Sequence, residues 1–146
     1  MAGPAAESRG GSGEGRVTIV HADFLSFRLP SRPFKVVGSL PFSGTTAILH
    51  RLFDDPSACL ERADLVVQYE VARKRTARPP TSLNSTVWAP WWDMRLGKRL
   101  PAEVFRPVPS VDAGVITVTR RNPPLLPTSM AREFEAFVRD NWPFGQ

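Results

Sequence analysis

The turn formed by residues 39–42, Ser-Leu-Pro-Phe, could bind a ligand through polar backbone groups and one aromatic face. It follows directly after the apolar run 34–38, which has the character of a buried strand. Open α/β sheets bind ligands beyond the carboxyl ends of their strands, which is where such a turn would lie. A turn that only caps the core has the same composition, so the string alone leaves both interpretations open.

Two further segments carry side chains that could contact a ligand. Phe105 begins a proline-rich stretch that ends at Asp112 and Ala113, and its ring could serve either a ligand or the core. Asp23 follows the apolar run 17–20, and its carboxylate could accept a hydrogen bond from an amine or cap a turn.

Basic side chains concentrate between residues 70 and 100. The chain has 19 Lys+Arg against 14 Asp+Glu, a net charge of +5. Only Glu70 and Asp93 are acidic in this segment, so it favours a polyanion such as RNA, although a solvated face would look the same. Trp88, Trp91 and Trp92 could stack bases there, but we expect at least two of them in the core. The basic residues of the segment are Arg73, Lys74, Arg75, Arg78, Arg95, Lys98 and Arg99.

Several kinds of site are excluded by composition. A single cysteine, Cys59, permits neither an internal disulfide nor a thiolate-rich metal site, and His21 and His50 are too isolated to bind zinc. No nucleophile elbow accompanies these histidines, which argues against a Ser-His-Asp arrangement. No membrane span or secretory signal is recognisable, so we expect a cytoplasmic monomer.

The elements that must position these residues form an α/β pattern. Residues 17–20, 34–38 and 65–68 predict short buried strands, and a helix is expected from about 46 to 53, ending before Pro56. A strand, helix, strand order implies a right-handed crossover and a parallel sheet.

The second half of the chain predicts two helices and two strands. A helix over 69–76 should end before Pro79-Pro80, and strands are expected over 91–99 and 111–121, joined as an antiparallel edge. An amphipathic helix with Met130, Phe134, Phe137, Val138 and Trp142 on one face should follow. We therefore expect a Gly/Ala-rich disordered leader (1–15), a domain that contains these strands and helices (16–127) and a C-terminal amphipathic helix (128–146).

The turn Ser39-Leu40-Pro41-Phe42 resembles the Asn-(Ile/Leu)-Pro-(Tyr/Phe) motif of methyltransferases that modify the amino group of adenine. Residues 105–113 are similar to the Phe-x-Pro-x-Pro-x-Val-Asp-Ser signature of the ribosomal RNA adenine-N6 methyltransferase family. The stretches 60–74 and 91–101 resemble its actinobacterial erythromycin-resistance branch, which methylates 23S rRNA. A DNA adenine methyltransferase would fit the turn but not the second signature.

The resemblance implies that residues 16–127 are a partial methyltransferase catalytic domain, with a partial Rossmann-like class I methyltransferase sheet and S-adenosyl-L-methionine as cofactor. Ser39 and a backbone carbonyl would hold the adenine amine, Phe42 and Phe105 would clamp the base, and Asp23, with Ser39, would contact the cofactor. The basic residues would bind ribosomal RNA.

Two departures from the family pattern lead to an alternative hypothesis. Ser39 stands where the family has asparagine, and the glycine-rich loop that holds the cofactor should precede Arg16, where residues 1–15 cannot supply it. The alternative is therefore an rRNA-binding relative with weak or no catalysis.

Overall fold

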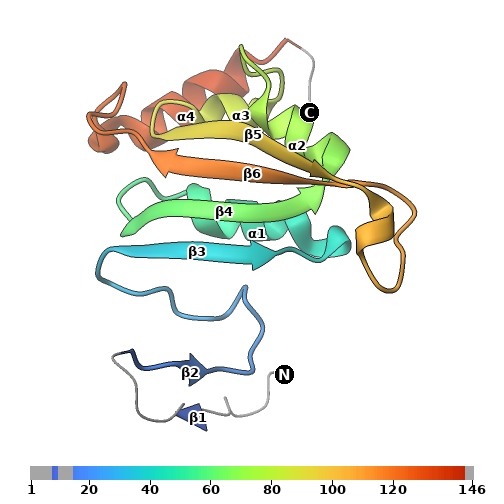
Figure 1. Cartoon of the computed structure of the whole chain (residues 1–146). Coiled ribbons are helices and arrows are strands. Elements are labelled where there is room, and N and C mark those ends of the chain that lie inside the picture. The colour runs from blue at the N-terminus through green and yellow to red at the C-terminus, as the bar shows by residue number, and fades with distance from the viewer. Residues whose placement is uncertain (1–7, 10–14, 144–146) are drawn as a thin grey trace.

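The computed structural model describes residues 8–9 and 15–143. Its centre is a four-stranded sheet in the order β3-β4-β6-β5 (Figure 1). The strands are β3 (Phe34–Ser39), β4 (Leu60–Gln68), β5 (Trp92–Leu100) and β6 (Ala113–Arg120). The α/β class and the positions of these four strands agree with the sequence-based expectation, with β4 longer than predicted.

The sheet is parallel on one side and antiparallel on the other. β3 and β4 pair in parallel through the crossover helix α1 (Thr45–Phe53), as the strand, helix, strand pattern predicts. β6 inserts antiparallel between β4 and β5, so β5 rather than β6 forms the outer edge.

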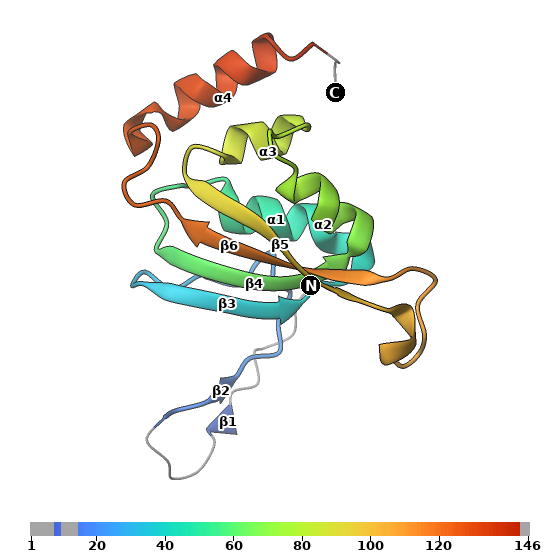
Figure 2. The ribbon, with the colours of Figure 1, turned by 45° about the horizontal axis from the view of Figure 1, so that its top comes forward.

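The helices all cover one face of the sheet (Figure 2). Besides α1 they are α2 (Tyr69–Thr76), α3 (Leu83–Trp88) and α4 (Ala131–Asp140). α2 has the predicted bounds, whereas α3 was not predicted because its six residues are too short to show a periodic pattern. None of these helices has the length and apolar character needed to cross a membrane, as far as residues 15–143 are concerned.

The core lies between this helical layer and the sheet. Trp88, Trp91 and Trp92 are all buried, which confirms that at least two of them belong to the core. Trp92 donates its indole N–H to the carbonyl of Phe53 at 3.1 Å, and the guanidinium of Arg120 lies 4.5 Å from the Trp92 ring centroid. Because each buried indole N–H has an acceptor, the cluster avoids the cost of an unpaired donor.

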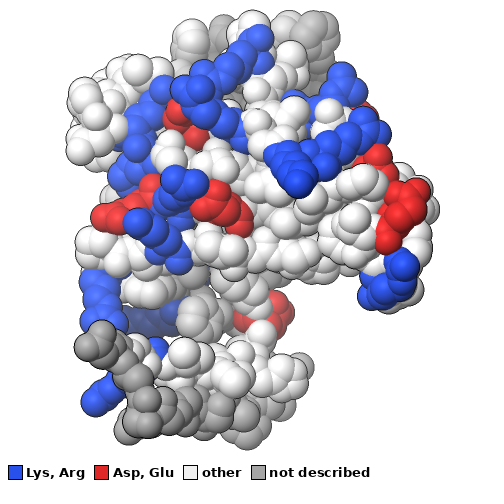
Figure 3. All heavy atoms as spheres, viewed as in Figure 1, with Lys and Arg blue, Asp and Glu red and all other residues white. Residues whose placement is uncertain are grey.

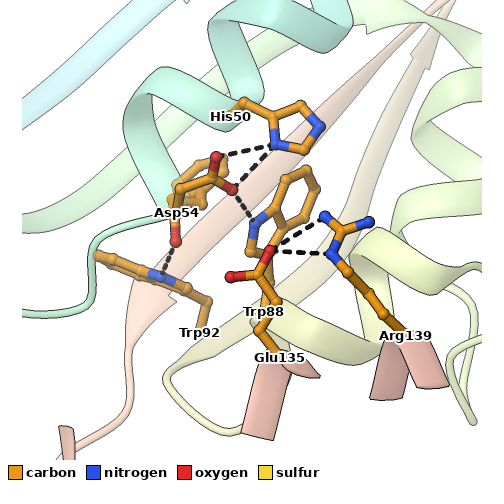
Figure 4. A network of polar contacts seen from close by, with 7 residues as sticks. His50, Asp54, Trp88, Trp92, Glu135 and Arg139 are labelled. Atoms are coloured by element: carbon orange, nitrogen blue, oxygen red, sulfur yellow. Dashed lines mark hydrogen bonds and ion pairs between the residues drawn. The ribbon is translucent and has the colours of Figure 1, made fainter. Parts of the chain in front are cut away.

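A polar network at the end of α1 joins the helices (Figure 4). Asp54 accepts hydrogen bonds from the indole N–H of Trp88 at 2.9 Å and contacts the Nδ1 atom of His50 at 2.9 Å. Glu135 and Arg139 form a separate ion pair on α4 at 3.0 Å. His50 also packs edge-on against Trp88, with ring centroids 5.3 Å apart, so it links α1 to α3.

The opposite face of the sheet is exposed along β3. Phe34, Val36 and Gly38 are half-buried, while Val37 is 84% exposed. The expectation of a fully buried strand is wrong here, because the described helices cover only one face. In Figure 3 charged side chains cover part of this face, and a neutral area extends toward the end where β3 and β4 terminate.

The region before β3 differs most from the prediction. Residues 17–20 do not form a buried strand: β2 (Thr18–Ile19) pairs only with β1 (Ser8–Arg9), outside the main sheet, and Val17 is 63% exposed. The pairing of Ser8 and Arg9 also corrects the expected disorder for those two residues. The rest of the expected leader, residues 1–7 and 10–14, lies outside the described part.

The C-terminal helix is amphipathic, but its apolar face is narrower than predicted. Val138 is buried and Phe134 packs edge-on against Trp91, with ring centroids 5.8 Å apart. Phe137 is 65% exposed, so the described chain covers only part of the apolar face of α4. Met130 is also exposed, because it lies in the 3-10 turn η3 (Thr128–Met130) before the helix begins.

Candidate functional site

The candidate site lies at the edge where β3, β4 and β5 end. Ser39 pairs with Val66 of β4, and two residues further along β4, Gln68 pairs with Ala113. Ala113 in turn pairs with Leu100, the last residue of β5. The ends of three strands and the start of the fourth therefore lie at one edge, from which the β5–β6 loop extends (Figure 1).

The turn after β3 is built by the backbone. The N–H of Leu40 continues the ladder by donating to the carbonyl of Val66 at 2.9 Å. Pro41 then begins the 3-10 turn η1 (Phe42–Gly44), and its carbonyl accepts the hydroxyl of Thr45 at 2.9 Å. Ser39 is exposed and the Phe42 side chain is 38% exposed, so both are accessible at the edge.

Asp112 organises the loop that carries Phe105. Its Oδ1 accepts the backbone N–H of Ala102 at 2.9 Å, and its Oδ2 accepts the Nε–H of Arg99, also at 2.9 Å. These donors, first the Ala102 N–H and then Arg99, hold the pKa of Asp112 below its ordinary value. Phe105 follows η2 (Ala102–Val104), so the carboxylate fixes the start of the turn on which Phe105 sits.

A hollow of about 360 Å³ lies beside this carboxylate. The guanidinium carbon of Arg99 lies 4.1 Å from the ring centroid of Tyr69, and the Tyr69 N–H donates to the carbonyl of Asp112 at 2.9 Å. The hollow is lined by Gln68, Tyr69, Glu70, Arg99, Ser110, Val111 and Asp112, a set that includes neither Phe42 nor Phe105. Phe42 and Phe105 thus lie at the same edge of the sheet, but neither of them lines this hollow.

Asp23 lies in a turn rather than directly at a strand end. Its Oδ1 accepts the N–H of Leu25 at 3.0 Å, and its carbonyl accepts the N–H of Ser26 at 3.1 Å. The side chain is exposed and retains a second carboxylate oxygen, Oδ2, so its chemistry fits an amine donor of a cofactor.

The predicted RNA-binding residues fall into two groups. Arg75 is only 8% exposed and donates to the hydroxyl of Ser82 at 3.1 Å, so it does not share the exposed face of α2 with Arg73 and Lys74. Burial also lowers the pKa of Arg75. Arg75 lies on the inner side of α2, which the run Arg73-Lys74-Arg75 does not reveal. The other six side chains, Arg73, Lys74, Arg78, Arg95, Lys98 and Arg99, are exposed.

Most of the exposed arginines have carboxylate partners. Arg73 pairs with Glu70 at 3.3 Å, and Asp93 pairs with Arg78 and, at 2.9 Å, with Arg95. Asp93 and Tyr69 were not predicted as organising residues. Arg78 and Arg99, which contact them, are distant in sequence or are brought near only by the strand register.

Comparisons with known proteins match nearly the whole chain. The model of the family "Ribosomal RNA adenine dimethylase" matches residues 6–142. An rRNA adenine N-6-methyltransferase of Corynebacterium diphtheriae is 41% identical over 122 residues, which are 84% of this chain and 47% of that protein. The mycinamicin-resistance protein MyrB of Micromonospora griseorubida is 39% identical over 124 residues, 85% of this chain and 39% of that protein.

Solved structures give the same result for the fold. The crystal structure of the 23S rRNA methyltransferase ErmE superimposes with a TM-score of 0.72 at 33% identity, over 82% of this chain and 49% of that chain. The match confirms the expected partial Rossmann-like sheet with late antiparallel strands. The chain spans less than half the length of the curated relatives described above.

Proposed function

This chain belongs to the ribosomal RNA adenine dimethylase family, and we propose that it carries the adenine-binding edge of an enzyme that methylates N6 of an adenine in 23S rRNA. The observation that carries the proposal is the common edge: the turn after Ser39 and the loop held by Asp112 both arise where β3, β4 and β5 end. Because one relative is named a mycinamicin-resistance protein and a solved structure is ErmE, the proposed function includes macrolide resistance.

In this proposal the base is held by stacking and its amine by oxygen acceptors. The exposed ring of Phe42 stacks on one side of the adenine and Phe105 on the other, each contact contributing about 1–3 kcal/mol. The hydroxyl of Ser39 and the carbonyl of Leu40 accept hydrogen bonds from the N6 amine. The carbonyl of Pro41 already accepts from Thr45 and from the N–H of Gly44, which favours Leu40 for this role.

In this mechanism the rate acceleration comes from the positioning of the adenine amine and the methyl donor rather than from proton transfer. The amine lone pair must point along the line of methyl transfer, and a well-oriented pair of reactants needs no general base before attack. When bound, S-adenosyl-L-methionine supplies the electrophilic methyl group. Asp23 would accept a hydrogen bond from the adenine amine of this cofactor, and Ser39 would lie between cofactor and target base.

The RNA partner is contacted by the exposed basic residues of α2 and β5. Lys74 and Lys98 have no ion-pair partner within residues 15–143, so their ammonium groups are the most available to phosphates. The remaining members of this set are Arg73, Arg95 and, just after α2, Arg78, whose carboxylate partners would be exchanged for phosphates. Arg99 would keep its bond to Asp112 and bind a phosphate through its remaining N–H groups.

Calorimetric titration with S-adenosyl-L-methionine tests whether this chain can act by itself. The proposal predicts saturable heat at millimolar ligand and a weaker response in Asp23→Ala, with Asp55→Ala as a control carboxylate remote from the site. No heat from a folded chain that still binds 23S rRNA would contradict autonomous catalysis and favour the RNA-binding alternative.

A further inference from the structure

A second hollow lies far from the candidate adenine site, behind the first residues of β5. It has a volume of about 280 Å³ and is bounded by the end of α2, by α3 and by the segment after β6. Three arginines line it: Arg75, Arg78 and Arg121. We refer to it as the arginine hollow.

Positive charge dominates the arginine hollow. Its lining includes three guanidinium groups and no carboxylate. The neighbouring acid is Asp93, which pairs with Arg78 and lies 4.0 Å from Arg121, but it also pairs with Arg95. One carboxylate thus faces several arginines, and the local surplus of positive charge would attract an anion.

Arg75 is held rigidly at the inner wall of the arginine hollow. Its guanidinium carbon lies 5.5 Å from the Trp88 ring centroid, and its Nη1 donates to Ser82 at 3.1 Å. Its Nε–H is buried and has no acceptor in the described part of the chain. A buried donor without an acceptor costs about 1–3 kcal/mol, so Arg75 is held here at a cost in stability and contributes its positive charge to the wall of the hollow.

The rest of the lining is apolar. Trp92, Met94 and Leu125 form this part, so a ligand with an anionic group and an uncharged body fits better than an isolated small ion. The volume lies at the lower end of ligand pockets, which suits one sugar-phosphate unit rather than a whole cofactor.

We propose that the arginine hollow binds one backbone phosphate of the RNA substrate, with the adjoining sugar against its apolar wall; this rests on the function proposed above. β5 connects the hollow to the candidate site, because Trp92 and Met94 line the hollow while Leu100 ends at the site edge. Arg95, Lys98 and Arg99 are exposed along this strand, and basic side chains (blue) lie over β5 in Figure 3. The strand is about 27 Å long at about 3.3 Å per residue, so RNA held in the hollow can reach the adenine edge.

The first test measures binding of the full chain to a 23S rRNA transcript over a range of salt concentrations, without cofactor. Arg78→Gln combined with Arg121→Gln should lower the slope of log K against log salt by about one, which corresponds to one lost phosphate contact. Arg132→Gln combined with Arg139→Gln removes the same charge from α4 and should leave the slope unchanged. The charge-preserving pair Arg78→Lys and Arg121→Lys should restore most of the slope.

The second test needs no substitution and therefore does not depend on the stability of a variant. NMR of the Arg75 Nε–H resonance should show a shift on addition of short single-stranded RNA and a much smaller shift with inorganic phosphate at the same phosphate concentration. A resonance that responds equally to inorganic phosphate would identify a free anion as the ligand and overturn the RNA assignment.

The remaining outcomes separate this proposal from the proposed function. Normal RNA binding with an unmoved Arg75 resonance and an unchanged slope in the glutamine pair would overturn the arginine hollow while leaving the methyltransferase proposal intact. A chain that binds no rRNA at all would overturn both.

Discussion

The carboxylate of Asp112 joins two segments that meet at the candidate site: its Oδ1 accepts the backbone N–H of Ala102 and its Oδ2 accepts Arg99, each at 2.9 Å. These bonds connect the end of β5 and the turn before Phe105 to the residue that precedes β6. Asp112 itself need not touch a ligand, and we regard it as a positioning residue.

Replacement of Asp112 should therefore destabilise the loop between β5 and β6 more than it destabilises the sheet. In Asp112→Ala both acceptors are lost, and the N–H of Ala102 should exchange with solvent faster, together with the neighbouring residues of the loop. Asp112→Asn keeps an oxygen for Ala102 but loses the charge that holds Arg99, so its effect should be smaller. Hydrogen exchange measured by NMR would contradict this role if both variants matched the parent chain.

Close packing of α2 on β6 gives a prediction for stability. A Cβ atom at Gly114 would lie 3.0 Å from the Cβ of Ala72 and 3.1 Å from the ring of Tyr69, whereas one at Gly38 would meet nothing within 4 Å. Gly114→Ala should lower the free energy of unfolding by about 1 kcal/mol, and Gly38→Ala should not lower it. Urea unfolding of the two variants is the measurement, and equal effects would show that α2 can move away at no cost.

The acid response of the sheet should depend on Asp64. Hydrogen bonds from Arg62 and then from Thr117 hold the pKa of Asp64 below its ordinary value. Because the folded pKa lies below the unfolded value of about 3.9, the stabilisation is present above that value and is lost as pH falls through the folded pKa. Asp64→Asn should therefore lose less stability on acidification; a curve parallel to that of the parent chain would contradict the assignment.

The salt dependence of rRNA binding should separate Arg73 and Lys74 from Arg75. Arg73→Gln combined with Lys74→Gln removes two exposed charges from α2 and should lower the slope of log K against log salt with little change in stability. Arg75→Gln should instead destabilise the chain, since Arg75 is buried between Ser82 and Trp88. An unchanged slope in the double variant would remove the outer face of α2 from the RNA-binding surface.

The sequence predicted the parts of the fold that depend on local patterns. α1 and α2 were predicted from apolar spacing and proline stops, and β6 from the alternation of Ile116 and Val118 with threonine. Burial was predicted wrongly where it depends on which element covers a surface. Residues 17–20 are apolar but exposed, and Val37 belongs to a face without helices. A single sequence shows that a run of residues is apolar, but it does not show which element packs against that run.

The site was predictable only as far as its motifs extend. Ser39 and Phe42 lie at the sheet edge expected for them, and their roles toward adenine stay predictions. The burial of Arg75 was not predicted, because three consecutive basic residues on a helix point in different directions and only the packing of α2 shows which one is inside. Asp112 belongs to the signature at 105–113, but that signature does not reveal that its carboxylate holds the N–H of Ala102.

The most direct measurement of the central claim is the N6-methyladenosine content of 23S rRNA after incubation with the chain and S-adenosyl-L-methionine, quantified by mass spectrometry of the nucleosides. We predict methylation by the parent chain, retention in Phe42→Tyr, which keeps the stacking ring, and a loss of at least about fivefold in Phe42→Ala, since about 1–3 kcal/mol of stacking is removed. Folding of each variant is checked by its unfolding midpoint. Methylation by Phe42→Ala at the level of the parent chain would contradict the account.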